Sequence, residues 1–573
     1  MLLFSLILIP LVGALAVALL PAKHAKAIAL LVTLVSIAVG ALALMQFQTD
    51  GTFSAEFQLT GQIAWMSNLG LSLSVGADGI SLTLILLTLL LGPICVLCSF
   101  TAITERLRTY YSWLLILQGA MVGVFAARDL ILFYTCFEFT LIPMFVLISL
   151  YGSTNRKRAA VKFFLYTFTG SMIALAGLVY VAWFNSALPT GTMGAGRWTF
   201  DIATLETAAL SMTASQQGWV LLALMAGFAV KVPLFPVHTW LPLAHTEAPT
   251  AGSVILAGVL LKLGTYGIYR FALPFCPQAI VEYAPLIGLL CIIGILYGGL
   301  ICWVQTDVKK LVAYSSVAHL GFCILGLVAL NQTGITGSVL YMVNHGLSTG
   351  ALFLCIGMIY ERYHTRSMKE LGGLAARMPV WSTFMVFFVM ASVGLPGLNG
   401  FISEFLCLLG AFQASDAWGS ALWATTGGLA GGEVPGATSG TLGPWYAAIA
   451  GTGMIVAAMY LLYMTGKIVW GPLKEPHAHG HSHGHGHGHG HADAHAHASV
   501  LPTDLNGREI GILIPLALLC LVLGVYPKPV MQLINAPIAE TVRTIDEGRS
   551  ALARSRGMLP AIAAIPETLQ GSR

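Results

Sequence analysis

Long apolar runs, each about the length of a bilayer-spanning helix, follow one another along almost the whole chain. A sliding window of roughly 19 residues predicts about fourteen spanning helices. The predicted spans are 2–21, 27–46, 78–103, 112–127, 130–150, 161–185, 218–242, 250–272, 283–304, 311–330, 336–360, 379–412, 444–470 and 509–527. This pattern predicts an all-α polytopic membrane protein.

Composition supports the same class. The chain has 573 residues, of which 57% are hydrophobic and 9% are charged, whereas soluble proteins carry about 25% charged residues. This deficit excludes a water-soluble enzyme, a nucleic-acid binder and a disordered scaffold. Ten cysteines lie mostly in apolar runs, and the single CxxC of Cys95 and Cys98 is interpreted as two packed thiols because no second pair accompanies it.

The distribution of lysine and arginine predicts the orientation. The first apolar run has the length of a signal peptide, but Lys23 and Lys26 follow it instead of preceding it, which favours a retained helix with its N-terminus outside. With that topology the inside loops and helix ends hold 17 Lys and Arg, and the outside loops hold three, Arg128, Arg197 and Arg270. An excess of this size is a strong positive-inside signal.

Two segments have unusual composition. Ten histidines alternate with Gly and Ala between His477 and His497, in a loop predicted to lie on the cytoplasmic side. Neutral imidazoles at this density are able to bind zinc or nickel, but we interpret the segment as a low-complexity loop without a role in the main chemistry. The tail after Tyr526 mixes charged and small apolar residues and is expected to form a surface helix against a neighbouring protein.

Ionisable residues inside the predicted spans are the main candidates for function. They are Glu138, Lys231, Lys262, His319, His345 and Glu404. A lysine or acid at the centre of a spanning helix costs about 2.5–3.5 kcal/mol on insertion scales. Pairing, internal water or a function must therefore offset the cost.

Two interpretations of these charges stay open at this point. In the first, Glu138 and Lys231 form a buried structural ion pair, but this leaves Lys262, Glu404 and two histidines unexplained. In the second, the titratable groups form a water-connected file along which protons move. For His345 alone, a core histidine without a relay role remains an alternative.

Interrupted helices favour transport. The seventh span has three prolines between Lys231 and Pro242, and the twelfth contains Gly394-Leu-Pro-Gly-Leu-Asn-Gly400. Such breaks are tolerated in a membrane only against protein or internal water, and at matching positions in two halves they indicate an inverted-repeat transporter. We predict two inverted five-helix repeats, spans 4–8 and 9–13. The predicted divisions are 1–111 (helices 1–3), 112–272 (first repeat), 273–470 (second repeat), 471–508 (His-rich loop), 509–527 (helix 14) and 528–573 (tail).

Several motifs resemble a known family. The run Lys231-Val-Pro-Leu-Phe-Pro-Val-His-Thr-Trp-Leu-Pro with the following Ala-His-Thr-Glu-Ala-Pro-Thr-Ala-Gly-Ser-Val is similar to the signature of the antiporter-like membrane subunits of respiratory complex I. Further matches are Leu260-Leu-Lys-Leu-Gly-Thr-Tyr-Gly267, Gln305-Thr-Asp-Val-Lys-Lys-Leu-Val-Ala-Tyr-Ser-Ser-Val-Ala-His319 and Gly394-Leu-Pro-Gly with Ser-Glu-Phe405. The resemblance covers roughly residues 70–527, and Tyr360-Glu-Arg-Tyr-His-Thr-Arg366 is typical of the branch that contains subunit M and mitochondrial chain four.

The resemblance implies a role for each charged position. The family's fifth-helix glutamate falls on Glu138 and its broken-helix lysine on Lys231. The connecting lysine falls on Lys262, the central histidine on His319, the eleventh-helix histidine on His345 and the terminal acid on Glu404. Other antiporter-like subunits usually carry lysine at this last position, so Glu404 favours the subunit M branch. Many relatives have an acid where this chain has Leu243, so no role of that acid is transferred.

The resemblance implies a proton-translocating subunit of an NADH:quinone oxidoreductase in a bacterial inner membrane, and the loop charges predict both termini on the periplasmic side. We expect no cofactor and no metal in this chain, because it has neither an Fe–S cysteine array nor a GxGxxG in a βαβ context. Flavin and Fe–S clusters are expected in partner subunits, with quinone as the substrate of the complex. The expected partners are other membrane-arm subunits, including two antiporter-like neighbours, and no nucleic acid.

Two other functions stay open. The chain is compatible with a subunit of a multi-subunit cation/proton antiporter, which would share the fold and most buried charges, although Glu404 and the run from Tyr360 to Arg366 argue against it. It is also compatible with a passive assembly scaffold in which the charges only fix helix register.

Overall fold

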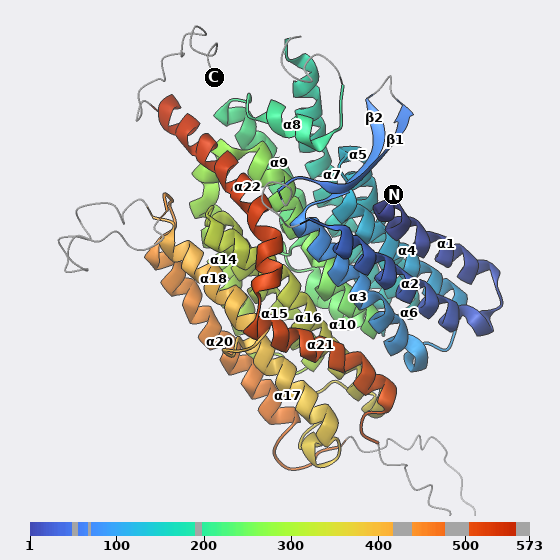
Figure 1. The fold of residues 1–573 in the computed structure, drawn as a ribbon. Helices are drawn as coiled ribbons and strands as arrows, with labels where there is room; N and C mark the ends of the chain where they lie inside the picture. Colours follow the sequence, from blue (N-terminus) through green and yellow to red (C-terminus); the bar gives the residue numbers. More distant parts are fainter. Residues whose placement is uncertain (49–54, 67–69, 190–197, 416–437, 476–502, 557–573) are drawn as a thin grey trace, which may run out of the picture.

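The structure is a computed structural model that describes residues 1–48, 55–66, 70–189, 198–415, 438–475 and 503–556. Within these residues the fold is a bundle of long helices with one small β-hairpin (Figure 1). In the described part of the chain, twelve helices are long and apolar enough to cross a membrane. The predicted all-α polytopic membrane fold is therefore confirmed.

Most predicted spans correspond to helices at the expected places, with ends that differ by a few residues. They are α1 (Leu2–Leu19), α2 (Ala25–Gln46), α3 (Gly79–Ala102), α4 (Leu107–Ala126), α5 (Leu130–Phe139) continued by α6 (Leu141–Tyr151), α7 (Arg156–Ala187), α14 (Pro277–Trp303), α15 (Val308–Val328), α16 (Gln332–Tyr363), α20 (Pro444–Ile468) and α21 (Gly507–Val525).

Two predicted spans are interrupted, as the prolines and glycines in them indicate. The span 218–242 consists of α9 (Ala214–Lys231) and α10 (Leu241–Glu247), and the span 379–412 consists of α17 (Pro379–Val393) and α18 (Asn399–Gln413). Proline removes a backbone donor in the first break. In the second, Gly394 and Gly397 have φ of +82° and +93°, which ends α17. The exact number of fourteen spans and the two inverted repeats stay predictions.

The span 250–275 is continuous but changes its helical winding twice. It runs through α11 (Thr250–Ile255), η4 (Leu256–Leu260), α12 (Leu261–Gly267), η5 (Ile268–Ala272) and α13 (Leu273–Phe275). Both η4 and η5 are π-helical, a winding that is rare and frequent at functional sites. This span and α16 are surrounded by other helices, and α15 almost as completely. The core of the bundle therefore lies around these three elements.

One end of the bundle, which we call the hairpin end, carries structure that the sequence analysis did not predict. Strands β1 (Gln58–Met66) and β2 (Leu71–Ala77) pair antiparallel there, and the short helix α8 (Ile202–Ala209) lies at the same end (Figure 1). Arg270, which the sequence analysis counted with the outside loops, is instead buried in the last turns of the 250–275 span.

The C-terminal tail forms the helix α22 (Lys528–Ser555), as expected, and its apolar face packs on this chain, against α14, α16 and α3. Its contact with a neighbouring protein stays a prediction. Ile534, Ile538 and Ile545 are buried, and the Tyr269 hydroxyl donates a hydrogen bond to Pro537 O at 3.1 Å. The helix lies diagonally across the bundle in Figure 1.

The opposite end, which we call the basic end, contains the loops 103–106, 152–155, 304–307, 364–378 and 469–475 together with the short helix η6 (Leu374–Ala376). The helix η1 (Ala22–His24) joins α1 and α2 there. The His-rich segment from His477 to His497 lies outside the described residues. In α3, Cys95 and Cys98 are buried, and the Cys98 thiol donates to Cys95 O at 3.3 Å, as expected for packed thiols.

Candidate functional site

Five polar side chains form a nearly continuous buried chain at the centre of the bundle. Lys262 Nζ of α12 lies 2.7 Å from His345 Nδ1 of α16, and the His345 and His319 rings are 6.0 Å apart between centroids. His319 Nδ1 of α15 lies 2.7 Å from the Tyr341 hydroxyl, which donates to Glu404 Oε1 of α18 at 2.7 Å. We call these five residues the central file; four helices contribute to it.

Hydrogen-bond roles assign the proton on each imidazole. Because the Tyr341 hydroxyl donates to Glu404, its oxygen accepts from His319 Nδ1, and a neutral His319 then has Nε2 as its base. A lysine ammonium only donates, so His345 Nδ1 accepts from Lys262 and the proton of a neutral His345 is on Nε2. Neither Nε2 atom has a hydrogen-bond partner in the described protein. The two histidines thus offer one donor and one acceptor that complement each other.

A small polar cavity of about 10 Å³ lies beside the central file. It is lined by His319, Tyr341, Asn344, His345, Ser348, Thr349, Ala391, Ser392, Gly400 and Glu404. This volume is at the lower limit of what one water molecule needs, and water occupies such a cavity when two to four polar partners surround it. The site therefore has the dimensions and the polarity to connect its histidines through water.

The π-helical winding and close helix contacts position Lys262. The ammonium donates to Ala257 O, in the preceding π-helical turn, as well as reaching His345. Gly258 and Gly346 allow η4 and α16 to approach, because a Cβ on Gly346 would lie 2.9 Å from Gly258 O. A larger residue there would separate the lysine from the histidine.

The break before α18 positions Glu404. A Cβ added to Gly394 would lie 2.7 Å from Glu404 Oε2, so the glycine backbone passes directly beside the carboxylate. Two reciprocal amide bonds join α18 to α16: Asn344 Nδ2 donates to Asn399 O at 2.7 Å, and Asn399 Nδ2 donates to Asn344 O at 3.2 Å. These two bonds fix the start of α18, and with it Glu404, against α16.

The structure places Lys231 and Glu138 apart from the central file. Lys231 is the last residue of α9; its ammonium donates to the Thr140 hydroxyl at 3.4 Å and lies 4.4 Å from the centre of the Phe137 ring. Glu138 is only partly buried and makes no ion pair with Lys231 within 4.0 Å, so the direct ion pair that the sequence allowed is not formed. The end of α9 packs on α12 through Gly264, which brings Lys231 to the element that carries Lys262.

Two further buried side chains that are able to transfer protons, Tyr341 and His245, were not among the residues predicted from the sequence. Tyr341 bridges His319 and Glu404, and His245 of α10 is fully buried with neither ring nitrogen bonded in the described protein. The His245 ring stacks on Phe353 with centroids 4.6 Å apart. The sequence signal was present for His245, which stands within the motif of the broken span, but a tyrosine in an apolar run gives no such signal.

A cavity of about 540 Å³ opens at the basic end next to this region. Its walls include Glu247, Ala248, Lys309 and Arg366. The Lys309 ammonium is buried and donates to Ala248 O, three residues from His245. Titratable groups thus extend from the basic end towards the bundle centre.

At the hairpin end, Arg270 and Asp78 form a buried ion pair. The Asp78 carboxylate also accepts from Ser81 N at the start of α3. Nearby, outside the spans, burial raises the pKa of Glu206 in α8 to about 7, and the charges of Asp78 and Asp201 contribute, while Arg270 opposes the shift. Within the described residues, no cluster of three or more His, Cys, Asp or Glu has the arrangement of a metal site.

Comparison with protein families decides the classification. The model described as "NADH:quinone oxidoreductase/Mrp antiporter, TM" matches residues 127–430, which contain all six charged positions. The chain belongs to this family. The resemblance inferred from the motifs is therefore confirmed.

Individual members of the NADH:quinone oxidoreductase/Mrp antiporter family are similar over nearly the whole chain. NADH-quinone oxidoreductase subunit M of Rhodobacter capsulatus is 38% identical, with 93% of each chain covered. NADH-ubiquinone oxidoreductase chain 4 of Marchantia polymorpha is 36% identical, with 94% of this chain and 96% of the relative covered. The fold is similar to a chain of respiratory complex I from Thermus thermophilus (TM-score 0.78, 26% identity, 95% and 100% covered) and of the Mrp complex from Dietzia sp. DQ12-45-1b (TM-score 0.73, 21% identity, 96% and 100% covered).

Proposed function

We propose that this chain is a proton-translocating membrane-arm subunit of an NADH:quinone oxidoreductase, in the position of subunit M. The central file carries the proposal: Lys262, His345, His319, Tyr341 and Glu404 are buried and linked by contacts of 2.7 Å apart from one histidine–histidine step. Such groups exchange protons when a neighbouring charge changes. Electron transfer in partner subunits supplies the driving force.

In the proposed cycle, Glu138 modulates Lys231 and protons pass along the central file. The cavity at the basic end, with Lys309 and then His245, is the entry that leads towards Lys262. Protons move through His345 and His319, and Glu404 connects to the far half-channel. His319 Nε2 accepts and His345 Nε2–H donates through one bridging water in the polar cavity.

The proposal includes the assembly and its membrane. The partners are membrane-arm subunits, including two antiporter-like neighbours, and flavin and Fe–S clusters belong to the partner subunits, with quinone as the substrate of the complex. The excess of lysine and arginine in the loops of the basic end supports a topology with that end cytoplasmic and both termini periplasmic. The similarity to bacterial subunit M supports a bacterial inner membrane. The six divisions predicted from the sequence are retained, with residues 112–272 and 273–470 as inverted repeats.

Purification distinguishes this function from the antiporter. The chain is isolated from its native membrane in mild detergent and assayed for NADH:quinone reductase activity, bound flavin and iron. We expect all three. A membrane complex without redox centres would instead favour the cation/proton antiporter.

Substitution tests the relay itself. In proteoliposomes containing the whole complex, we expect Glu138→Ala, Lys231→Ala and Lys262→Ala largely to abolish NADH-driven proton uptake while the complex still assembles. Lys310→Ala is the matched control, because Lys310 is exposed on the helix that carries His319. Normal pumping in the first three variants would contradict the relay; reduced assembly with fully coupled residual turnover would indicate a scaffold.

A further inference from the structure

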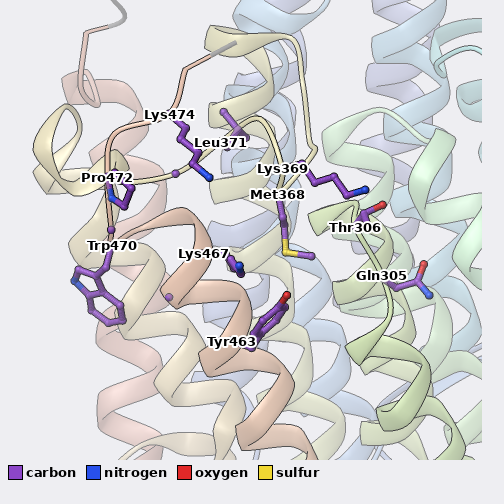
Figure 2. A pocket seen from close by; sticks show the side chains of 13 residues that line it. Gln305, Thr306, Met368, Lys369, Leu371, Tyr463, Lys467, Trp470, Pro472 and Lys474 are labelled. Carbon is purple, nitrogen blue, oxygen red and sulfur yellow. The ribbon is translucent and has the colours of Figure 1, made fainter.

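A cavity of about 660 Å³ at the basic end is unrelated to the central file. Three segments line it: the loop between α14 and α15, the loop between α16 and α17, and the end of α20 with the residues that follow. Figure 2 shows Lys467, Lys474 and Tyr463 on one side of the cavity and Lys369, Thr306 and Gln305 on the other.

Backbone hydrogen bonds hold the three segments together. Met368 N donates to Thr306 O at 2.9 Å, Lys474 N donates to Gly372 O at 2.8 Å, and Gly373 N donates to Trp470 O at 3.2 Å. The cavity walls are therefore built by the fold and not by chance contacts of long side chains.

The cavity carries positive charge that the described part of the chain does not neutralise. No aspartate or glutamate is among its lining residues, and Lys369, Lys467 and Lys474 make no ion pair within 4.0 Å in the described protein.

Three carboxylates that stand next to lining residues in the sequence are engaged elsewhere, and one of them, Glu370, accepts a hydrogen bond from the Thr365 hydroxyl at 2.7 Å. Asp307 is 3.4 Å from Arg366, and Glu475 is 3.5 Å from Arg377. Three ammonium groups around one cavity therefore attract an anion.

The cavity also opens onto an apolar surface. Tyr463 of α20 and Trp470, two residues beyond the end of α20, are exposed. The Tyr463 ring stacks on Trp303 at the end of α14 with centroids 6.0 Å apart. Met459 lies one helical turn from Tyr463 on the same face and is exposed. Aromatic rings of this kind mark the level of the lipid headgroups, and the exposed apolar face beyond them suits acyl chains.

We propose that this cavity binds the phosphate-containing headgroup of an anionic phospholipid, whose acyl chains lie along the outer faces of α14 and α20. Lys467 and Lys474 bind the phosphate and Lys369 adds long-range attraction. Basic cavities between spanning helices at a membrane surface suit such headgroups, and the adjoining apolar face favours a lipid over a soluble anion. The proposal holds whichever side of the membrane the basic end occupies.

Photo-crosslinking of the purified, delipidated complex tests the site. The probe is a photoactivatable phosphatidylglycerol in phosphatidylcholine vesicles, and crosslinked peptides are mapped by mass spectrometry. We expect crosslinks in residues 459–474 and 300–306, with apparent affinity lowered about fivefold for each lysine replaced by glutamine at positions 369, 467 and 474. The control combines Lys23→Gln, Lys157→Gln and Lys310→Gln, three exposed lysines of the same end, and should bind as the native chain does.

Any of the following results would contradict the proposed lipid site. Equal crosslinking by the matching phosphatidylcholine probe, or crosslinking unchanged when Lys369, Lys467 and Lys474 are all replaced by glutamine, would exclude recognition of an anionic headgroup. Full competition by 10 mM inorganic phosphate, added at constant ionic strength, would assign the cavity to a free anion. Crosslinking or contact of these residues with a neighbouring subunit, and not with the probe, would assign the surface to protein.

Discussion

At the scale of single residues, buried charges are tolerated because most have a partner. A lysine in the centre of a span costs about 2.5–3.5 kcal/mol, yet Lys262 contacts both Ala257 O and His345 Nδ1. Lys231 has weaker partners, a 3.4 Å contact with Thr140 and the face of Phe137. The two lysines therefore differ in how firmly the protein holds them, and Lys231 has the greater freedom to move.

Tyr341 is expected to carry protons between His319 and Glu404. Tyr341→Phe removes the bridging hydroxyl, so we expect NADH-driven proton pumping in proteoliposomes to fall. The loss should be smaller than the roughly 10²-fold effect of removing a proton-transfer group, because His319 Nδ1 still lies 3.3 Å from Glu404 Oε1. Tyr446→Phe is the control, since that hydroxyl only donates to Pro285 O at the edge of the bundle. Unchanged pumping in Tyr341→Phe would exclude a relay role.

Gly394→Ala, compared with Gly397→Ala, separates the effect of contact with Glu404 from the effect of backbone strain at a positive φ. The new Cβ would lie 2.7 Å from Glu404 Oε2 and the backbone has φ of +82°, so we expect displacement of the carboxylate and loss of pumping. Gly397→Ala is the matched control, because its φ is +93° but nothing lies within 4 Å of its Cβ. Both variants incur the left-handed backbone cost of about 1–2 kcal/mol. Equal pumping in the two would mean that contact with Glu404 is unimportant.

At this scale the sequence predicted which positions carry ionisable side chains but not which of these side chains are in contact. Glu138, Lys231, Lys262, His319, His345 and Glu404 stand out because each interrupts an apolar run. A sequence does not say which of them touch, and so it placed Glu138 and Lys231 in a possible ion pair that does not form. Tyr341 was missed because tyrosine is common in membrane helices, and its role depends on two partners from other helices.

At the scale of elements, breaks were predictable where proline or positive-φ glycine causes them. The interruptions after Lys231 and after Val393 have such causes in the sequence. The π-helical turns η4 and η5 do not: they depend on how the 250–275 span packs against its neighbours. The β-hairpin was missed because its strands are short and lie between much stronger apolar runs.

Packing of α22 depends on a glycine at the start of α3. Gly79 lies against Leu533 O so closely that a Cβ has no room, and we expect Gly79→Ala to displace α22 at a cost of about 1–3 kcal/mol. Gly507→Ala is the matched control, because Gly507 also begins a helix and nothing lies within 4 Å of its Cβ. Limited proteolysis of the assembled complex should cleave the C-terminal segment faster only in Gly79→Ala. Equal cleavage rates would contradict this packing role.

At the scale of the whole molecule, the two ends differ in chemistry. The basic end holds unpaired lysines and two open cavities, whereas the hairpin end holds buried acids around Arg270. The central file lies between them, with lysine and histidines on one side and Glu404 on the other. In the proposed cycle, a proton that enters by Lys309 and His245 meets Lys262 and the two histidines before Glu404.

The hairpin end is expected to make stability depend on pH. Burial raises the pKa of Glu206 to about 7 in the folded protein, against about 4.3 in an unfolded chain. The folded state thus binds this proton more tightly, so its stability should fall as pH rises from about 4 to about 7 and then level off. Replacing the acid by glutamine removes that loss, because glutamine stays neutral.

We therefore expect the midpoint of thermal unfolding of the complex to decrease less between pH 5.5 and pH 8 in Glu206→Gln than in the native chain. Glu547→Gln is the control, since Glu547 is exposed on α22 at the same end. Its pH dependence should match that of the native chain. The charges around Glu206 come from α8, the 250–275 span, the start of α3 and α22, so its proton reports on how these elements fit together. If the unfolding midpoint of Glu206→Gln kept the full native pH dependence, the Glu206 carboxyl would have to be solvated in the native protein. The hairpin end would then be packed more loosely around Glu206 than the burial of Asp78 and Arg270 requires.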